Sequence, residues 1–157
     1  MKLRDFVCFE ATITELQASD RDGVIEELVA SLDKAGKLRK GKSKDISREV
    51  IKRENEASTG LGKGVAVPHV KHKDVKQVVA VIGQTSAGID FSALDKQPVY
   101  SVILLISPSE DPDKHLQAME AVFKHLQKER FRKFLRQCSR KEQIEDLITE
   151  ADEEPSW

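Results

Sequence analysis

Two continuous apolar runs, residues 78–82 and 99–106, mark the middle of the chain. Runs of this length without polar alternation are typical of strands that are covered on both faces. A shorter run at 65–67 ends at Pro68 and predicts a third strand. Residues 6–16 alternate weakly and include several β-branched side chains, which predicts a strand near the N-terminus. Residues 88–91 predict a turn followed by a short strand.

Apolar residues recur at the spacing of amphipathic helices in most of the remaining segments. The first such segment spans 24–32, and the second spans 46–51 and should end near Arg53 because glycines follow. A third begins after Asp111, and a final one covers 144–148. Together these elements predict an α/β fold with a mixed, mostly parallel β-sheet sandwiched between helices. We expect a single domain at residues 1–149 and a flexible acidic tail at 150–157.

Composition narrows the class of protein. A chain of 157 residues favours one domain, and 39% hydrophobic with 34% charged residues is typical of a soluble globular protein. The net charge of −1 disfavours nucleic-acid and membrane-surface proteins, which usually carry a basic excess. No segment has the roughly 18 apolar residues of a spanning helix, and no signal-peptide pattern follows Met1. We therefore expect a cytoplasmic protein in which Cys8 and Cys138 are reduced.

A glycine-rich loop precedes the short apolar run at 65–67. Gly60, Gly62 and Gly64 alternate there, directly after Ser58 and Thr59. The spacing differs from that of dinucleotide- and nucleotide-binding loops, and the loop precedes a strand instead of following one. Closely spaced glycines let backbone N–H groups approach an anion, and the hydroxyl groups add donors. From the spacing alone, an anion-binding loop and an ordinary flexible turn remain equally open.

The four histidines are the next candidates for chemistry. His69 directly follows Pro68 at the end of a predicted strand, where an imidazole can be a base, a metal ligand or a nucleophile, although spacing alone favours a structural role. His72 forms an HxxH pair with His69, but a zinc site needs three or four ligands and no cysteine is near. His115 shares the inward face of the third helix, which favours a core or capping role, whereas His125 is expected at the surface.

Arg53 lies at the expected end of the second helix, just before the glycine loop. A guanidinium there could bind an oxyanion held by that loop, because its fork matches phosphate oxygens. The alternative, which spacing alone favours, is a cation that interacts with the helix C-terminus beside a solvated Glu54.

Taken together, these residues resemble the enzyme IIA domains of the bacterial phosphoenolpyruvate-dependent sugar phosphotransferase system, in the mannitol, fructose and nitrogen-regulatory class. The resemblance extends over roughly residues 5–149. The family motif is an Arg-Glu pair, a Ser-Thr-Gly-x-Gly-x-Gly loop, an apolar triplet and Pro-His. It stands in this chain as Arg53-Glu54, Ser58-Thr59-Gly60-Leu61-Gly62-Lys63-Gly64, Val65-Ala66-Val67 and Pro68-His69. Later matches include Gly88-Ile89-Asp90-Phe91, Leu94-Asp95 and His115-Leu116.

The resemblance implies a role for each residue of the motif. His69 would accept a phosphoryl group, on Nε2, from a histidine-containing phosphocarrier protein. His115 would orient the group or hydrogen-bond to it, and Arg53 would stabilise its charge. The resemblance implies no cofactor and no metal. The loop that would bind the phosphoryl group consists of Ser58, Thr59, Gly60 and Gly62.

Three functions remain open on this basis. Members of the family either pass the phosphoryl group to an enzyme IIB domain or use the phosphorylated state to signal to a regulated target protein. Because the sequence contains neither an enzyme IIB domain nor a permease, we favour a nitrogen-type regulatory protein over a fructose- or mannitol-specific carrier. In both roles the chain would act as a phosphotransferase with a phosphohistidine intermediate. The third function is a binding module that has lost phosphotransfer.

Overall fold

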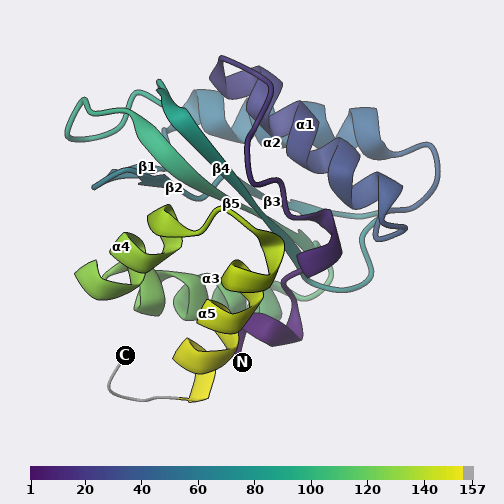
Figure 1. The fold of residues 1–157 in the computed structure, drawn as a ribbon. Coiled ribbons are helices and arrows are strands. Elements are labelled where there is room, and N and C mark those ends of the chain that lie inside the picture. Colours follow the sequence, from purple (N-terminus) through teal and green to yellow (C-terminus); the bar gives the residue numbers. More distant parts are fainter. Residues whose placement is uncertain (154–157) are drawn as a thin grey trace.

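The two apolar runs form the long central strands of one mixed sheet (Figure 1). β4 (Val79–Ile89) and β5 (Val99–Pro108) pair in antiparallel fashion. On the other side of β5, β2 (Val65–Ala66) and β3 (His69–His72) both run parallel to it. β1 (Gly60–Gly62) pairs antiparallel with β2 at the edge. This computed structural model describes residues 1–153 of the chain.

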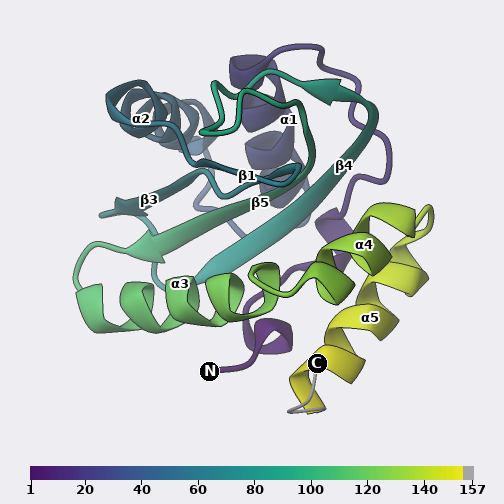
Figure 2. The same ribbon diagram turned by 90° about the vertical axis from the view of Figure 1, so that its left-hand side faces the viewer.

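Helices cover both faces of the sheet, as the two views show (Figure 1 and Figure 2). α1 (Arg21–Lys34) and α2 (Ser43–Glu56) lie on one face. α3 (Pro112–Leu126), α4 (Glu129–Gln137) and α5 (Lys141–Glu153) lie on the other. The expected single α/β domain, with a mixed sheet between helices, is confirmed. Among residues 1–153, no helix combines the length and the apolar character needed to cross a membrane.

The alternation of side chains along β5 explains why residues 102–106 are all apolar. Val102, Leu104 and Ile106 are buried in the cluster shared with α1 and α2. Ile103 and Leu105 are buried in the cluster shared with α3, α4 and α5. Because successive side chains of a strand point to opposite faces, a strand covered on both sides needs apolar residues at most of its positions.

The strand expected at residues 6–16 is not formed. The segment instead contains one short 3₁₀ turn, η2 (Phe9–Ala11), and a second, η1 (Leu3–Asp5), directly precedes the segment. The segment pairs with β4 through two isolated bridges, Val7 with Ala80 and Ile13 with Gly83, and Leu16 N donates to the carbonyl oxygen of Gln84 at 2.8 Å. The expectation was wrong because η2 folds the chain away from β4 between the two bridges, so that a continuous ladder cannot form.

The short strand expected after residue 88 is also wrong. β4 itself continues to Ile89, and the segment that follows it, residues 90–98, is a loop in the part of the chain described here. Ser92 and Lys96 have φ angles of 53° and 60°. These values lie in the left-handed region and are incompatible with an extended strand.

The C-terminal helix is longer than its apolar pattern suggests. α5 runs to Glu153, so residues 150–153 are not a flexible tail; residues 154–157 of that expected tail lie outside the described part. Asp152 accepts hydrogen bonds from the backbone N–H groups of Leu3 and Arg4, both at 2.9 Å. Arg4 in turn pairs with Glu153 at 2.7 Å. These contacts hold the end of α5 against the N-terminal turn.

Candidate functional site

His69 is the first residue of β3 and is only partly exposed. Its Nδ1 lies 2.8 Å from the carbonyl oxygen of Val67. A carbonyl oxygen can only accept a hydrogen bond, so Nδ1 must carry the proton. In the neutral ring the lone pair is therefore on Nε2. The preceding residue, Pro68, anchors this corner because its carbonyl oxygen accepts a bond from Leu105 N at 3.0 Å.

The surroundings keep the His69 ring neutral. Burial lowers the pKa of His69, and the positive charges of Arg53 and Lys71 lower it further. The hydrogen bond to Val67 and the negative charge of Glu54 act in the opposite direction but do not reverse the shift. At pH 7 the imidazole is consequently uncharged, which is the form that can act as a nucleophile.

His115 lies beside His69, although 46 residues separate them in the sequence. Their ring centroids are 5.6 Å apart, with the planes tilted by 42°. His115 stands in the first turn of α3, which begins at Pro112 and is capped by the Asp111 side chain. Its Nδ1 is 2.7 Å from Ser107 Oγ, at the end of β5. Burial, His69 and Lys71 lower the pKa of His115 to about 4, so this ring is also neutral.

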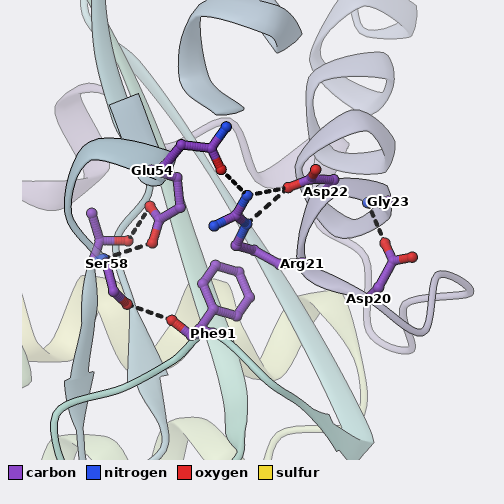
Figure 3. Close-up of polar contacts among 9 residues, drawn as sticks. Asp20, Arg21, Asp22, Gly23, Glu54, Ser58 and Phe91 are labelled. Atoms are coloured by element: carbon purple, nitrogen blue, oxygen red, sulfur yellow. Dashed lines mark hydrogen bonds and ion pairs between the residues drawn. The ribbon is translucent and has the colours of Figure 1, made fainter. Parts of the chain in front are cut away.

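The glycine loop is held by hydrogen bonds within the protein (Figure 3). Ser58 Oγ donates to the carbonyl oxygen of Phe91 and accepts a bond from Gly60 N at 3.0 Å. Thr59 donates twice to the carboxylate of Glu54, from its backbone N–H at 2.6 Å and from Oγ1 at 2.8 Å. Glu54 is only 2% exposed. The loop is thus an ordered part of the structure and not a flexible turn.

Gly60 is required where the loop passes the segment after β4. A Cβ atom at this position would lie 2.9 Å from the backbone Cα of Ala93. Such a contact would force one of the two backbones to move, so no larger residue fits without a shift.

A chain of hydrogen bonds connects the buried carboxylate to His69, and we call it the Glu54 relay. Glu54 holds Thr59, and the carbonyl oxygen of Thr59 accepts a bond from Val67 N at 3.2 Å. Val67 then accepts the bond from His69 Nδ1. The relay fixes the position of the backbone group that sets the protonation pattern of the imidazole.

Comparison with known proteins assigns the family. The model of the phosphoenolpyruvate-dependent sugar phosphotransferase system, EIIA 2, matches residues 7–151. The chain belongs to this enzyme IIA family.

The relatives of this enzyme IIA domain differ in role. The present chain is 30% identical over 152 residues to the fructose-specific EIIABC component of Bacillus subtilis. This match covers 97% of the present chain but only 24% of that protein. The chain is 34% identical over 110 residues to the nitrogen regulatory protein of Klebsiella oxytoca, covering 69% and 68% of the two chains. The solved structure of nitrogen regulatory protein IIA-Ntr from Neisseria meningitidis superimposes with a TM-score of 0.82 at 24% identity, covering 92% and 97%.

Some of the expected site residues lie next to each other in the structure, and others are hydrogen-bonded to other parts of the protein. His69 and His115 adjoin each other. Arg53 Nη1 donates to the carbonyl oxygen of Ala57 at 3.0 Å, and its charge acts on His69. The hydroxyl groups of Ser58 and Thr59, expected to bind a phosphoryl group, instead donate hydrogen bonds to the carbonyl oxygen of Phe91 and to the carboxylate of Glu54. Gly62, with a φ of 89°, forms the end of β1.

Two residues of the site were assigned no role from the sequence. Glu54 was expected to be solvated, but it is buried and organises the glycine loop. It stands four and eight residues after Val50 and Ile46, which are buried on the same face of α2, and this spacing was the available signal. Ser107 contacts His115 only because β5 and α3 meet, and no local pattern indicates that contact.

The environments of α3 differ from expectation at both ends. His125, expected at the surface, is buried and lies 5.3 Å from the ring of Phe131. Its Nε2 is 3.7 Å from Asp152, because α4 and α5 both pack on this end of the helix. The spacing of Leu116, Met119 and Phe123 predicts that Leu116 faces inward, but it is 58% exposed next to His115.

The second residue of the HxxH pair belongs to a separate cluster. His72 Nε2 is 2.7 Å from Asp45 Oδ2, and its Nδ1 accepts a bond from the backbone N–H of Asp74 at 3.0 Å. The three residues have the chemistry of a metal site, with ligand atoms within 4.8 Å of one another. Arg39 and Lys42 already pair with Asp74, at 3.2 Å and 3.6 Å. Asp45 thus pairs with His72, and Asp74 pairs with Arg39 and Lys42 from outside the cluster, which joins α2 to β3 away from His69.

Proposed function

We propose that this enzyme IIA domain is a phosphohistidine carrier in which His69 accepts a phosphoryl group from a histidine phosphocarrier protein. The observation that carries the proposal is the hydrogen bond from His69 Nδ1 to Val67, which leaves a lone pair on Nε2. A neutral imidazole with a free nitrogen is the nucleophile that such a transfer needs.

The transfer balances without loss of a proton. Nε2 of His69 attacks the phosphorus of the donor phosphohistidine, a new N–P bond forms, and the old N–P bond breaks with its electron pair returning to the donor imidazole. The proton of His69 stays on Nδ1, where it remains hydrogen-bonded to the carbonyl oxygen of Val67. The incoming group carries about two negative charges, and donors already in place stabilise it.

Arg53 and His115 are the groups we assign to this stabilisation. The charge of Arg53 already acts on His69, so it also attracts the phosphoryl oxygens. When the Ser107 hydroxyl group donates a hydrogen bond to His115 Nδ1, the proton of the neutral ring is on Nε2. This N–H group can then donate a hydrogen bond to a phosphoryl oxygen. In this assignment the glycine loop and the Glu54 relay position His69 and do not bind the phosphoryl group through their hydroxyl groups.

Exposed apolar side chains near the site fit a protein partner better than a small substrate. Leu116, which follows His115, is 58% exposed, and Leu94 is 84% exposed. Leu94 donates its backbone N–H to Gly60 of the glycine loop at 3.3 Å. Apolar side chains around a reactive group are typical of the core of a protein–protein interface. The partners we propose are the phosphocarrier protein and then an enzyme IIB domain or a regulated target.

For the physiological role we favour regulation of the nitrogen type. The identity of 34% to a nitrogen regulatory protein supports this role. The second candidate is a fructose-type carrier that passes the group to enzyme IIB, and the match of 97% of the chain to a fructose-specific component supports it.

Phosphoryl acceptance is tested with enzyme I, a histidine phosphocarrier protein and phosphoenolpyruvate. We expect an acid-labile adduct on His69 Nε2, identified by NMR, and no labelling of a His69→Ala variant. His115→Ala should still be labelled but should transfer the group onward more slowly. If the wild-type protein stays unlabelled while a control enzyme IIA is labelled, the chain is a binding module without phosphotransfer.

The two roles are separated by adding a purified fructose enzyme IIB to the labelled protein. Regulation predicts that the phosphohistidine persists for much longer than in a parallel reaction with a fructose-specific enzyme IIA. Rapid transfer at a rate similar to that of the control would favour the sugar-uptake role instead.

A further inference from the structure

The segment from residue 128 to 141 concentrates positive charge. It contains seven basic residues and one acidic residue, a net charge of +6 in a chain whose net charge is −1. The remainder of the chain therefore carries −7. The segment runs from the residue before α4 to the first residue of α5.

α4 presents this charge next to an exposed aromatic ring. Phe131 and Leu135 are buried and fix the inner face of the helix. Lys133 and Arg136 are exposed on the outer face, and Phe134 is 43% exposed beside them.

A hollow of about 810 Å³ opens along this face. Four of its six lining residues are cationic. The lining residues are Lys63, Glu129, Arg132, Lys133, Arg136 and Gln137.

The two arginines of the hollow are held in place but not neutralised. Arg132 Nη1 donates to the carbonyl oxygen of Leu126 at 2.6 Å, which caps the end of α3. The guanidinium carbon of Arg136 lies 3.7 Å from the ring centroid of Tyr100. Within residues 1–153, neither these two arginines nor Lys133 forms an ion pair with a carboxylate.

The hollow lies against the hairpin of β1 and β2, which contains the glycine loop. Tyr100, on which Arg136 stacks, donates its backbone N–H to the carbonyl oxygen of Gly64 at 2.8 Å. Lys63, one residue earlier, has its own N–H bound to Asp95 at 2.9 Å. Both sides of the hollow are therefore preorganised, which lowers the entropy lost when a ligand binds.

We infer that the α4 face, formed by Lys63, Arg132, Lys133, Phe134 and Arg136, is a docking surface for a short acidic segment of a partner protein. Carboxylates of the segment would occupy the hollow, and an apolar side chain would lie on Phe134. Arginines and aromatic rings are the residues that contribute most to protein–protein affinity. The inference does not depend on phosphoryl transfer to His69.

The boundaries of the face favour a peptide over a long polyanion or a membrane. Asp146 and Glu150 line the adjoining hollow on the other side of Phe134, so the positive surface ends there. A nucleic acid would extend past this limit onto a chain whose remaining net charge is −7. α4 has nine residues and only one large apolar side chain exposed on it, too little to insert into a bilayer surface.

The test measures binding of a dodecapeptide of glutamates with one central leucine to the unphosphorylated protein. We expect saturable binding at low ionic strength, with amide shifts in ¹H–¹⁵N spectra confined to α4 and residue 63. Lys133→Glu should weaken binding by about threefold, and Lys133→Glu with Arg136→Glu by about tenfold, since each exposed charge pair is worth less than about 1 kcal/mol.

The matched control is Lys40→Glu with Lys44→Glu, which changes the net charge equally at exposed positions in another basic segment. It should leave the affinity unchanged within about twofold. The single variant Lys133→Glu keeps the test valid if loss of the Tyr100 stack unfolds the double variant. Equal weakening by the control, or shifts spread over the surface, would overturn the inference. So would tighter binding of a single-stranded RNA 12-mer or of phosphatidylglycerol vesicles than of the peptide.

Discussion

Replacing Glu54 by alanine tests whether the Glu54 relay positions His69, the proposed phosphoryl acceptor. The carboxylate is buried and accepts two hydrogen bonds from Thr59, at 2.6 Å and 2.8 Å. Without it, the backbone N–H and the hydroxyl group of Thr59 have no partner in a site that excludes water. Thr59 is then free to move, and with it Val67, which it holds through its carbonyl oxygen.

The size of the effect follows from these contacts. A hydrogen bond to a charged group contributes about 1.5–3 kcal/mol, so losing both removes about 3–6 kcal/mol. Relief of the desolvation of a buried carboxylate offsets part of this loss. We expect Glu54→Ala to lower the free energy of unfolding by about 2–4 kcal/mol. Displacement of His69 by a fraction of an ångström should slow phosphorylation by about tenfold or more.

Two measurements and two comparison variants isolate the role of the relay. Urea denaturation gives the free energy of unfolding, and single-turnover labelling from the phosphocarrier protein gives the rate. Glu54→Gln should recover most of both, because the amide oxygen can still accept from Thr59 N and the amide N–H can donate to Thr59 Oγ1. Glu56→Ala, at an exposed position on the same turn of α2, is the matched control and should be close to wild type.

The outcome that refutes the reasoning is specific. If Glu54→Ala folds with less than about 0.5 kcal/mol of lost stability, the two bonds do not have the strength that burial implies. If stability falls but labelling of His69 keeps the wild-type rate, Glu54 supports the fold and the relay does not position the imidazole.

Three further predictions concern charge and the C-terminal contacts. Because the pKa of His115 falls from 6.5 when unfolded to about 4 when folded, the unfolded state binds more protons between these values, and stability should decrease as pH falls from 6.5 to 4, measured by urea denaturation. Lys71→Gln removes a positive charge that lowers the pKa of both His69 and His115, so NMR titration should show both values raised. Asp152→Ala removes the acceptor for Leu3 N and Arg4 N and should lower the free energy of unfolding by about 1–3 kcal/mol in chemical denaturation.

Neighbouring variants serve as controls for these predictions. His115→Asn should flatten the pH dependence of stability, and an unchanged slope would assign the effect to other groups. Lys73→Gln, which is not among the causes of either histidine shift, should leave both titrations in place. Glu150→Ala, at an exposed position on α5, should cost little; a loss equal to that of Asp152→Ala would indicate a general effect on the helix.

The sequence predicts elements well where burial alone determines them. The apolar runs within β4 and β5 could be predicted directly, because most positions of a doubly covered strand must be apolar. β3 could not be predicted, since its residues His69–His72 are mostly polar and follow a proline. They are extended because they pair with the end of β5, which is a tertiary contact. The strand predicted for the N-terminal segment was wrong for the opposite reason. Its β-branched residues favour a strand, but the segment forms two isolated bridges and no continuous ladder.

The site residues were harder to predict than the strands, because the site depends on contacts between elements that are distant in the sequence. His69 and His115 could be assigned only through the family motif, because neither spacing nor periodicity indicates that β3 and α3 meet. The hydroxyl groups of Ser58 and Thr59 were expected to face a ligand. Which partner a hydroxyl group finds depends on what is buried next to it, here Glu54 and the carbonyl oxygen of Phe91.

The same charges serve both states of the proposed reaction. Arg53 and Lys71 lower the pKa of His69, which keeps its ring neutral before transfer. After transfer they would face about two negative charges on the phosphoryl group, and their attraction would then stabilise the product. This requirement is identical for a carrier in sugar uptake and for a regulatory protein, so the site cannot distinguish the two roles. The difference must lie on surfaces that select a partner, and the concentration of positive charge on α4 makes that face the first place to look for it.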